Sequence, residues 1–265
     1  MTNADTDALR LTLVQCDLVW QDAASNRALL EAQLAPLAGT TDLVLLPEMF
    51  TSAFVVGAGA VPEPHPGPTL EWMQGLARDL DAALCGSVAV RVDGKQLNRL
   101  LFVTPDGEVQ HYDKRHLFRM LGEHERYAAG TDKLLLSWRG WRIFPTVCYD
   151  LRFPVWCRNT EKEPYDVMLC VANWPAPRSE HWSALLKARA IENLAFVAGV
   201  NRVGRDGNDM HYAGQSAVYG PQGETVAHAG DSATLTHAVL QRDALTTWRT
   251  QFPAYMDADN FQLFD

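Results

Sequence analysis

The sequence predicts a layered α/β fold, and three features of the chain lead to that prediction. Short, fully apolar segments such as 43–46 and 167–171 are typical of strands buried on both faces in an α/β protein. Strand and helix patterns recur in two broad halves, which favours a pseudo-symmetric layered sandwich. No linker rich in Gly, Ser or charge and no short-period repeat interrupts the 265 residues, so we expect a single domain over 1–265.

The first elements alternate between strand and helix. Residues 9–15 alternate well enough for a strand, and leucines at helical spacing predict a helix over 23–37. The apolar strand at 43–46 then ends in Pro47-Glu48. An acidic side chain at that position would face a site at the end of the strand.

The middle of the chain predicts a helix followed by antiparallel strands. Four prolines between 61 and 68 indicate a loop, and a helix is expected over 69–80. Strands over 83–90 and 97–103 are joined by the turn dipeptide Asp93-Gly94. After the charged segment 111–118, an ordered polar loop is expected over 122–130.

A thiol lies at the end of the next strand. The apolar strand over 143–147 runs directly into Cys148, and Pro154 suits the first turn of a following helix. A thiol at such a turn can lie near helix N–H groups, which favour the thiolate. We therefore predict a strand, a sharp turn carrying Cys148, and a helix.

The rest of the chain adds further strands and one long helix. A helix over 179–193 is expected to place Trp182, Leu185, Leu186 and Ile191 largely on one face. The remaining strands are expected at 167–171, 196–201, 215–219 and 234–239.

Composition argues against several classes of partner. The formal net charge is −9 with no Lys/Arg-rich run, which disfavours a nucleic-acid partner. No apolar segment approaches the roughly 18 to 20 residues that span a bilayer, and residues 1–7 form a polar leader rather than a signal peptide. Five widely spaced cysteines indicate reduced thiols. We therefore expect a cytoplasmic protein with neither a membrane nor a nucleic-acid partner.

Three reactive side chains, those of Glu48, Lys114 and Cys148, share one context. Each lies at the end of, or beside, an apolar strand-like segment, so the three could converge at one edge of a sheet. Taken singly, each has an ordinary interpretation, because loop acids and lysines are commonly solvated and a lone cysteine is usually a small buried hydrophobe. Only the combination points to a catalytic site.

The residues around these three side chains resemble those of a known family. LLPEMF around Glu48, YDKRHLF around Lys114 and CYDLRFP around Cys148 resemble, in this order and over almost the whole chain, the nitrilase superfamily of carbon–nitrogen hydrolases. The resemblance implies a four-layer α-β-β-α sandwich and a Glu-Lys-Cys catalytic triad that needs no metal and no other cofactor.

The chemistry of amide hydrolysis suits these residue types. An amide is a poor electrophile, so Cys148 would attack as a thiolate and form a thioester. Glu48 would take the thiol proton, return it to the leaving ammonia and then activate water. Lys114 would lower the thiol pKa and, with the backbone N–H of Tyr149, stabilise the oxyanion.

The resemblance also implies a second acid in the loop after the lysine, where both Glu123 and Glu125 are available. Glu123 is preferred because in the family this acid lies seven residues before the glycine that closes the loop, here Gly130, with an aromatic residue at the place of Tyr127. Its expected role is to orient the substrate amide and to hold Lys114.

The substrate prediction rests on smaller similarities. Tyr149-Asp150 after the cysteine resembles the amide-hydrolysing branches, and the segments 173–178 and 189–193 look most like the omega-amidases, which deamidate 2-oxo dicarboxylic acid monoamides such as 2-oxoglutaramate. A substrate carboxylate favours a guanidinium, for which Arg152 is the candidate. Trp174 and Phe118 are the expected pocket walls, although a structural ion pair for Arg152 and plain core packing for the aromatics stay open.

Several alternatives remain at this point. Within the same fold, the activity could be that of an N-carbamoyl amino acid hydrolase or an aliphatic amide hydrolase. A Cys-His hydrolase would use one of the histidines His111, His116, His124 or His181 as base. Zinc is disfavoured because the cysteines lack C-x2-C spacing and the histidines lack H-E-x-x-H spacing. A non-catalytic binding module is the remaining class.

The final segment, 252–265, contains Tyr255, Phe261, Leu263 and Phe264 and is too aromatic for a freely solvated end. We expect it to pack against another surface, such as a subunit interface. The resemblance and this tail together predict a homodimer or a higher homo-oligomer.

Overall fold

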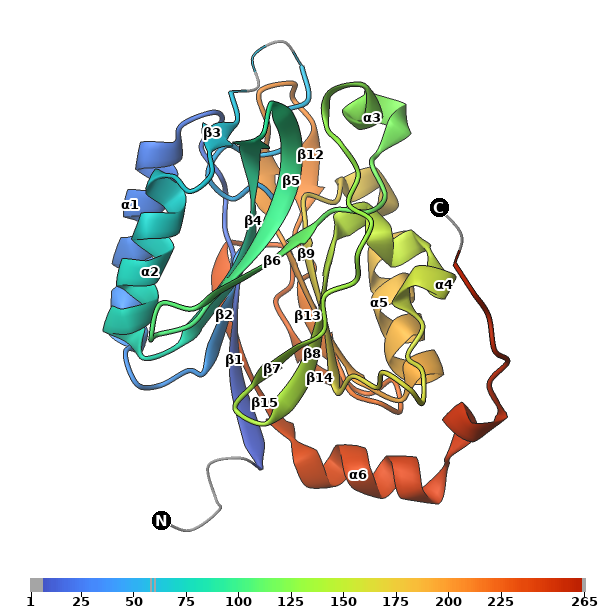
Figure 1. The fold of residues 1–265 in the computed structure, drawn as a ribbon. Coiled ribbons are helices and arrows are strands. Elements are labelled where there is room, and N and C mark those ends of the chain that lie inside the picture. The colour runs from blue at the N-terminus through green and yellow to red at the C-terminus, as the bar shows by residue number, and fades with distance from the viewer. Residues whose placement is uncertain (1–6, 58, 60, 264–265) are drawn as a thin grey trace.

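The computed structural model describes residues 7–57, 59 and 61–263. Of the expected polar leader over 1–7, all but Asp7 lie outside the described residues, as do Phe264 and Asp265 of the tail. Two mixed β-sheets pack face to face, and helices cover both outer faces (Figure 1). The predicted α-β-β-α sandwich is confirmed.

The first sheet is built mainly from the first half of the chain. Its strands β1, β2 and β4 are parallel, whereas β15 and β5 are antiparallel to their neighbours. In spatial order the strands are β15 (Thr234–Gln241), β1 (Ala8–Gln15), β2 (Leu43–Leu45), β4 (Ala83–Val92), β5 (Lys95–Val103) and β6 (Val109–Asp113), with β3 (Glu63–Pro64) beside β4.

The second sheet repeats this pattern. Its three central strands, β8, β9 and β10, are parallel to one another. Beside β10 the sheet continues with the antiparallel strands β13 and β14, and beside β8 it ends with the antiparallel strand β7. In spatial order the strands are β7 (Leu136–Trp138), β8 (Trp141–Val147), β9 (Val167–Ala172), β10 (Phe196–Asn201), β13 (Ala217–Tyr219) and β14 (Thr225–His228). A separate pair joins β11 (Val203–Arg205) to β12 (His211–Ala213).

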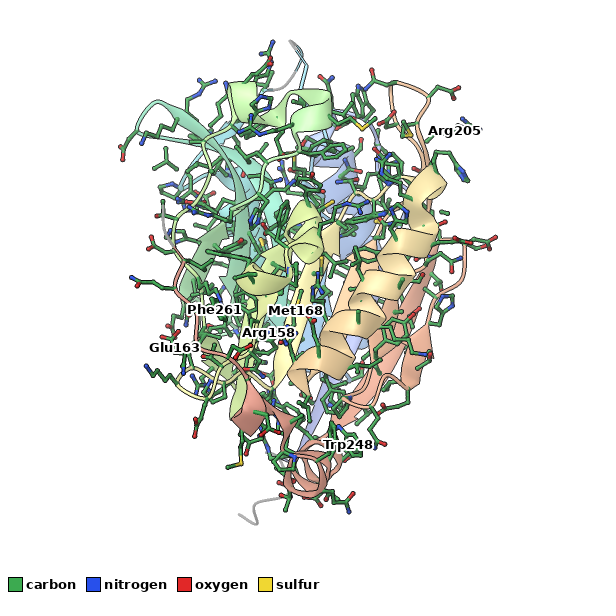
Figure 2. The ribbon with its side chains drawn as sticks, turned by 90° about the vertical axis from the view of Figure 1, so that its right-hand side faces the viewer. Arg158, Glu163, Met168, Arg205, Trp248 and Phe261 are labelled. Atoms are coloured by element: carbon green, nitrogen blue, oxygen red, sulfur yellow. The ribbon has the colours of Figure 1, made fainter. Side chains whose placement is uncertain are left out.

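Side-chain alternation along the strands divides the core into layers. In β1, Leu9, Leu11 and Leu13 pack against the second sheet, whereas Val14 faces the outer helices. Because successive strand residues point to opposite faces, one strand serves both layers. The helices α1 (Ala23–Leu34) and α2 (Pro68–Leu80) cover the first sheet, and α5 (Ser179–Asn193) lies along the second (Figures 1 and 2).

Several sequence expectations were wrong in detail. The helix α6 (Arg242–Gln251) was not predicted, since its sequence contains few apolar residues and Leu245 is its only fully buried one. The loop expected over 122–130 contains the one-turn helix α3 (Glu123–Arg126). Ile191 was expected on the buried face of α5 but is 49% exposed, because the buried residues of that helix follow Trp182 and Leu186.

The described part of the aromatic tail is exposed on the surface of the single chain. The tail contains the short turn η6 (Ala254–Asp257), and its exposed apolar side chains include those of Phe252, Met256, Phe261 and Leu263. The described part of the tail is therefore not buried against its own chain.

The topology brings the ends of four strands to one place. β2, β4 and β6 run in the same direction within the first sheet, as do β8 and β9 in the second. Glu48 follows β2, Lys114 follows β6 directly, Cys148 follows β8 and Asn173 follows β9. Ligands of open α/β sheets bind at the carboxyl ends of strands, so this edge is where a site is expected.

Candidate active site

The Cys148 turn is a strained connection held by an aspartate. Cys148 begins the 3₁₀ turn η4 (Cys148–Arg152) and has a φ of +46°, a left-handed conformation that costs a non-glycine residue about 1 to 3 kcal/mol. The buried Asp150 carboxylate accepts hydrogen bonds from the Val147 N–H at 2.9 Å and from the Tyr112 hydroxyl at 2.8 Å. These contacts force the turn and direct the thiol towards the strand ends. The helix α4 (Pro154–Cys157) then begins at Pro154, as predicted.

Lys114 lies between two buried carboxylates. Its Nζ atom is 2.8 Å from Oε1 of Glu48 and 2.9 Å from Oε2 of Glu123, and all three side chains are almost fully inaccessible. Glu123 also accepts from the backbone N–H of Phe118 at 2.6 Å. Glu125, the alternative second acid, has a side chain that is 75% exposed. Of the two loop acids, the structure therefore brings Glu123 to Lys114.

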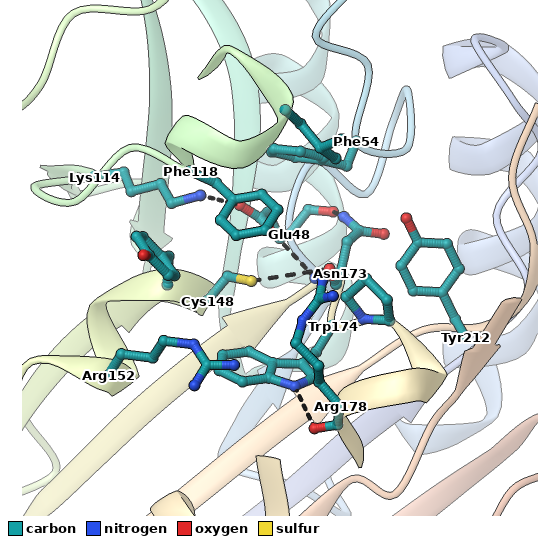
Figure 3. Close-up of a pocket in the computed structure, with 13 residues that line it drawn as sticks. Glu48, Phe54, Lys114, Phe118, Cys148, Arg152, Asn173, Trp174, Arg178 and Tyr212 are labelled. Atoms are coloured by element: carbon teal, nitrogen blue, oxygen red, sulfur yellow. Dashed lines mark hydrogen bonds and ion pairs between the residues drawn. The ribbon is translucent and has the colours of Figure 1, made fainter. Parts of the chain in front are cut away.

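Two asparagines complete the polar contacts of Glu48. The side-chain amide of Asn98 donates to Oε1 of Glu48 at 2.8 Å and to Oε1 of Glu123 at 3.3 Å. The backbone N–H of Asn173 donates to Oε2 of Glu48 at 2.9 Å. Both oxygens of the Glu48 carboxylate are thus held, and the Cys148 thiol lies nearby, donating weakly to the Asn173 carbonyl at 3.9 Å (Figure 3).

Burial and charge set the protonation of this cluster. Burial acts to lower the pKa of Lys114, but the Glu123 and Glu48 carboxylates outweigh it and raise that pKa well above its usual range. Burial, opposed by Lys114 and assisted by Glu48, raises the pKa of Glu123. Burial and the Glu48 carboxylate also raise the pKa of the Cys148 thiol, although Lys114 lowers it. The expectation that the turn favours a resting thiolate was wrong, because burial dominates.

The pocket above the thiol has an empty volume of about 390 Å³. All four residues predicted to contact the substrate, Tyr149, Arg152, Trp174 and Phe118, line it together with Glu48, Lys114 and Cys148. The rings of Phe118 and Tyr149 meet edge to face at 5.0 Å. Arg152 stacks on Trp174 at 4.6 Å and contacts Nδ1 of His181 at 3.1 Å. Within the described chain Arg152 forms no ion pair with a carboxylate.

The four histidines considered as alternative bases lie elsewhere. None of them lines this pocket, which is built from described residues alone. The His116 ring stacks on Phe153 at 3.7 Å, and its Nδ1 atom is 2.8 Å from Asp150. No cluster of three His, Cys, Asp or Glu side chains suited to a metal ion occurs in the described part of the chain.

Sequence reasoning missed seven residues of the site: Phe54, Asn98, Leu121, Asn173, Pro175, Arg178 and Tyr212. Asn98 is a buried polar residue of β5, and buried polar residues usually have a specific partner. Asn173 and Arg178 stood in a recognised string but received no role. No sequence signal separated Phe54, Leu121 and Tyr212, which also line the pocket, from other apolar and aromatic residues.

This chain is similar to known proteins over nearly its whole length. The model of the carbon–nitrogen hydrolase family matches residues 10–250. Omega-amidase YafV of Escherichia coli (strain K12) is 51% identical over 97% of this chain and 99% of its own length. The 2-oxoglutaramate amidase of Bacillus subtilis (strain 168) is 28% identical over 93% of this chain and 96% of its own.

A solved structure agrees in architecture as well. The crystal structure of a CN-hydrolase superfamily protein from Xanthomonas campestris, with an arsenic adduct in its active site, superposes with a TM-score of 0.95. It is 50% identical and covers 97% of this chain and 99% of that one.

Proposed function

This chain belongs to the carbon–nitrogen hydrolase family, and on that premise we propose that it is an omega-amidase. Its substrate would be a 2-oxo dicarboxylic acid monoamide such as 2-oxoglutaramate or 2-oxosuccinamate, hydrolysed to the 2-oxo acid and ammonia. The similarity to omega-amidase YafV over nearly all of both chains supports this substrate class. In this proposal, residues 1–265 form one catalytic domain.

One observation carries the mechanism: a cation held between two buried carboxylates lies beside a thiol at the base of a pocket. Cys148 attacks the amide carbon while Glu48 accepts the thiol proton. The developing oxyanion is stabilised by Lys114 and the backbone N–H of Tyr149, an arrangement whose individual donors are commonly worth about 3 to 4 kcal/mol.

The remaining steps return the enzyme to its starting state. Glu48 delivers the proton to the amide nitrogen, the C–N bond breaks and ammonia leaves behind a thioester on Cys148. Glu48 then removes a proton from water, hydroxide adds to the thioester carbonyl, and the C–S bond breaks as Cys148 recovers its proton. Glu123 holds Lys114 in place and orients the substrate amide.

The raised pKa of the thiol fits this sequence. A thiol that is protonated at rest requires a base at the moment of attack, and Glu48 is the carboxylate whose position supports that role. Lys114 neutralises much of the negative charge that develops on the oxyanion. The proton can therefore move from Cys148 to Glu48 without leaving an uncompensated buried ion.

The test is ammonia release by Glu48→Gln, with Glu125→Gln as the matched control. We expect Glu48→Gln to fold but to lose turnover of 2-oxoglutaramate, and Glu125→Gln to keep it because that side chain is exposed. Near wild-type activity of Glu48→Gln, together with loss of activity in His116→Ala or His181→Ala, would replace this mechanism with a Cys-His one.

Substrate class is tested separately with the wild-type protein. Ammonia release is compared across 2-oxoglutaramate, 2-oxosuccinamate, glutamine, aliphatic amides and N-carbamoyl amino acids. A strong preference for N-carbamoyl amino acids or simple aliphatic amides would overturn the omega-amidase assignment while leaving the catalytic residues intact. No turnover of any amide, with Cys148 unreactive towards alkylation, would support a binding module.

We further propose that the protein is a cytoplasmic homodimer. Exposed apolar side chains on α5 and in the tail, including Ile191, Phe252, Met256 and Phe261, support an interface there. All five cysteines are free and buried, as expected in a reducing compartment. None of the helices in the described ranges is both long and apolar enough to cross a membrane. Light scattering tests the dimer, and cell fractionation tests the location.

A further inference from the structure

Two guanidinium groups face the same pocket without a carboxylate partner. Arg152 lies at the end of η4 and Arg178 at the end of η5 (Ala176–Arg178), and both line the same pocket as Cys148 (Figure 3). Arg152 contacts only an imidazole nitrogen and an aromatic face, and Arg178 only an aromatic face. Within the described residues neither side chain forms an ion pair.

Aromatic rings hold both side chains in position. The Arg152 guanidinium lies 4.6 Å from the centre of the Trp174 ring, and that of Arg178 lies 5.5 Å from the centre of the Phe118 ring. Trp174 connects the two, because its indole N–H donates to the Arg178 carbonyl at 2.7 Å. Its own backbone N–H donates to Asn201 at 2.7 Å. Planar guanidinium groups stacked on fixed rings are partly ordered before any ligand arrives.

The backbone that carries Arg178 is also constrained. Pro175 precedes the turn and Pro177 lies within it, and the Arg178 N–H donates to the Pro175 carbonyl at 3.0 Å. Prolines restrict the backbone torsions of this turn. The position from which the Arg178 side chain extends is therefore well defined.

The pair makes the pocket cationic on an acidic protein. Of the charged side chains that line it among the described residues, three are cationic and one is anionic, and the anionic one, Glu48, is already paired with Lys114. Burial and the positive charge of Arg178 lower the pKa of Arg152. Two like charges that face one space repel each other, and an anion between them would relieve that repulsion.

We infer that Arg178 and Arg152 together form the subsite for the 2-oxo carboxylate end of the substrate, with Arg178 as a specificity-determining residue; this rests on the proposed omega-amidase function. A 2-oxo carboxylate presents three adjacent oxygen acceptors, and each guanidinium presents several donors in a planar fork. One fork can bind the carboxylate while the other reaches its remaining oxygen and the neighbouring ketone.

The same geometry explains how glutamine would be rejected. Glutamine carries an ammonium group where the 2-oxo acid carries a ketone oxygen, and that ammonium would face two cations. The only carboxylate that lines the described pocket is occupied by Lys114. An unpaired charge that repels its surroundings is an effective means of excluding a similar ligand.

The experiment compares Arg178→Gln and Arg178→Lys with the wild type on three substrates: 2-oxoglutaramate, glutaramate, which lacks the ketone, and butyramide, which lacks both groups. For Arg178→Gln we expect KM for 2-oxoglutaramate to rise by about 10- to 100-fold, the range for a lost charged hydrogen bond, with kcat much less affected. KM for glutaramate should rise less, and butyramide turnover should not change. Arg178→Lys should recover part of the loss, because it restores the charge without the fork.

The matched control is Arg78→Gln, on the exposed surface of α2 far from the pocket, which should leave all three KM values unchanged. Equal losses on all three substrates, or an unchanged KM for 2-oxoglutaramate in Arg178→Gln, would overturn the inference. Thermal unfolding of each variant separates a folding defect from a binding defect.

A binding measurement separates this inference from the proposed function. If the wild type releases no ammonia from 2-oxoglutaramate, the omega-amidase proposal fails. The subsite is then tested by direct binding of 2-oxoglutarate, glutarate and glutamate. Tighter binding of 2-oxoglutarate than of the other two, lost in Arg178→Gln, would support the subsite, and equal binding of all three acids would refute it.

Discussion

Asn173 connects the two sheets through Glu48, because its backbone N–H and its side-chain amide donate to the carboxylate and to the backbone carbonyl of that one residue. Glu48 follows β2 of the first sheet and Asn173 follows β9 of the second. The two residues are 125 positions apart in the chain. The proposed base is therefore positioned by the opposite half of the sandwich.

Replacing Asn173 with alanine removes only the side-chain part of this connection. The buried Glu48 carbonyl loses its donor, which costs about 1 to 3 kcal/mol, whereas the backbone N–H still holds the carboxylate. We expect urea unfolding to show that loss of stability, with a lower kcat. Asn208→Ala, in an exposed turn, is the control and should change neither quantity. Wild-type stability in Asn173→Ala would show that the contact is unimportant.

Asn98→Ala tests the donor that Glu48 and Glu123 share. Without it the ionised form of the Glu123 carboxylate loses a donor, so the acid limb of the kcat/KM profile should move to higher pH. The measurement is kcat/KM for 2-oxoglutaramate across the acid range. A uniformly lower profile with an unmoved limb would mean that Asn98 is merely structural.

Lys114→Met leaves two buried carboxylates without their cation. Breaking a buried ion pair in this way typically costs about 3 to 5 kcal/mol, and the proposed oxyanion donor is lost, so turnover should disappear. Protonation of the carboxylates relieves the repulsion, hence the stability deficit relative to wild type should be smaller at pH 5 than at pH 8. Lys187→Met, exposed on α5, is the control. A deficit independent of pH would contradict the assignment.

Cys148→Ala should reveal the raised thiol pKa through alkaline stability. The folded state keeps the thiol protonated, whereas the unfolded thiol ionises near its ordinary pKa of about 8.5. The free energy of unfolding that depends on this proton is constant below that pH, and it declines as the pH rises towards the pKa of the thiol in the folded state. Relative to Cys148→Ala, the wild type should lose about 1.4 kcal/mol per pH unit above that point.

This comparison isolates one thiol. The other buried cysteines, such as Cys16 with a pKa raised by burial to about 12, are present in both proteins and cancel in the difference. Urea unfolding between pH 7 and 10 provides the measurement. Parallel curves for the two proteins would show that burial does not protect the proton on Cys148.

Local sequence was sufficient for much of the architecture. The apolar runs that became β2, β8 and β9 are readable because a strand buried on both faces needs apolar residues at every position. The end of such a run is equally visible, which placed Glu48 and Cys148 at strand ends. The helix α6 was missed because its sequence is largely polar and Leu245 is its one buried residue.

By itself, then, the sequence determined the strand ends, which depend on residues that are adjacent in the chain, and the combination of three separate strings predicted the layered sandwich and the three reactive side chains. Only the tertiary structure showed that Glu123 contacts Lys114, brought Asn98 to both carboxylates and placed Arg178 and Arg152 at one pocket. These contacts join residues from separate strands and turns. Their distances depend on how the two sheets pack, and no local pattern encodes that packing.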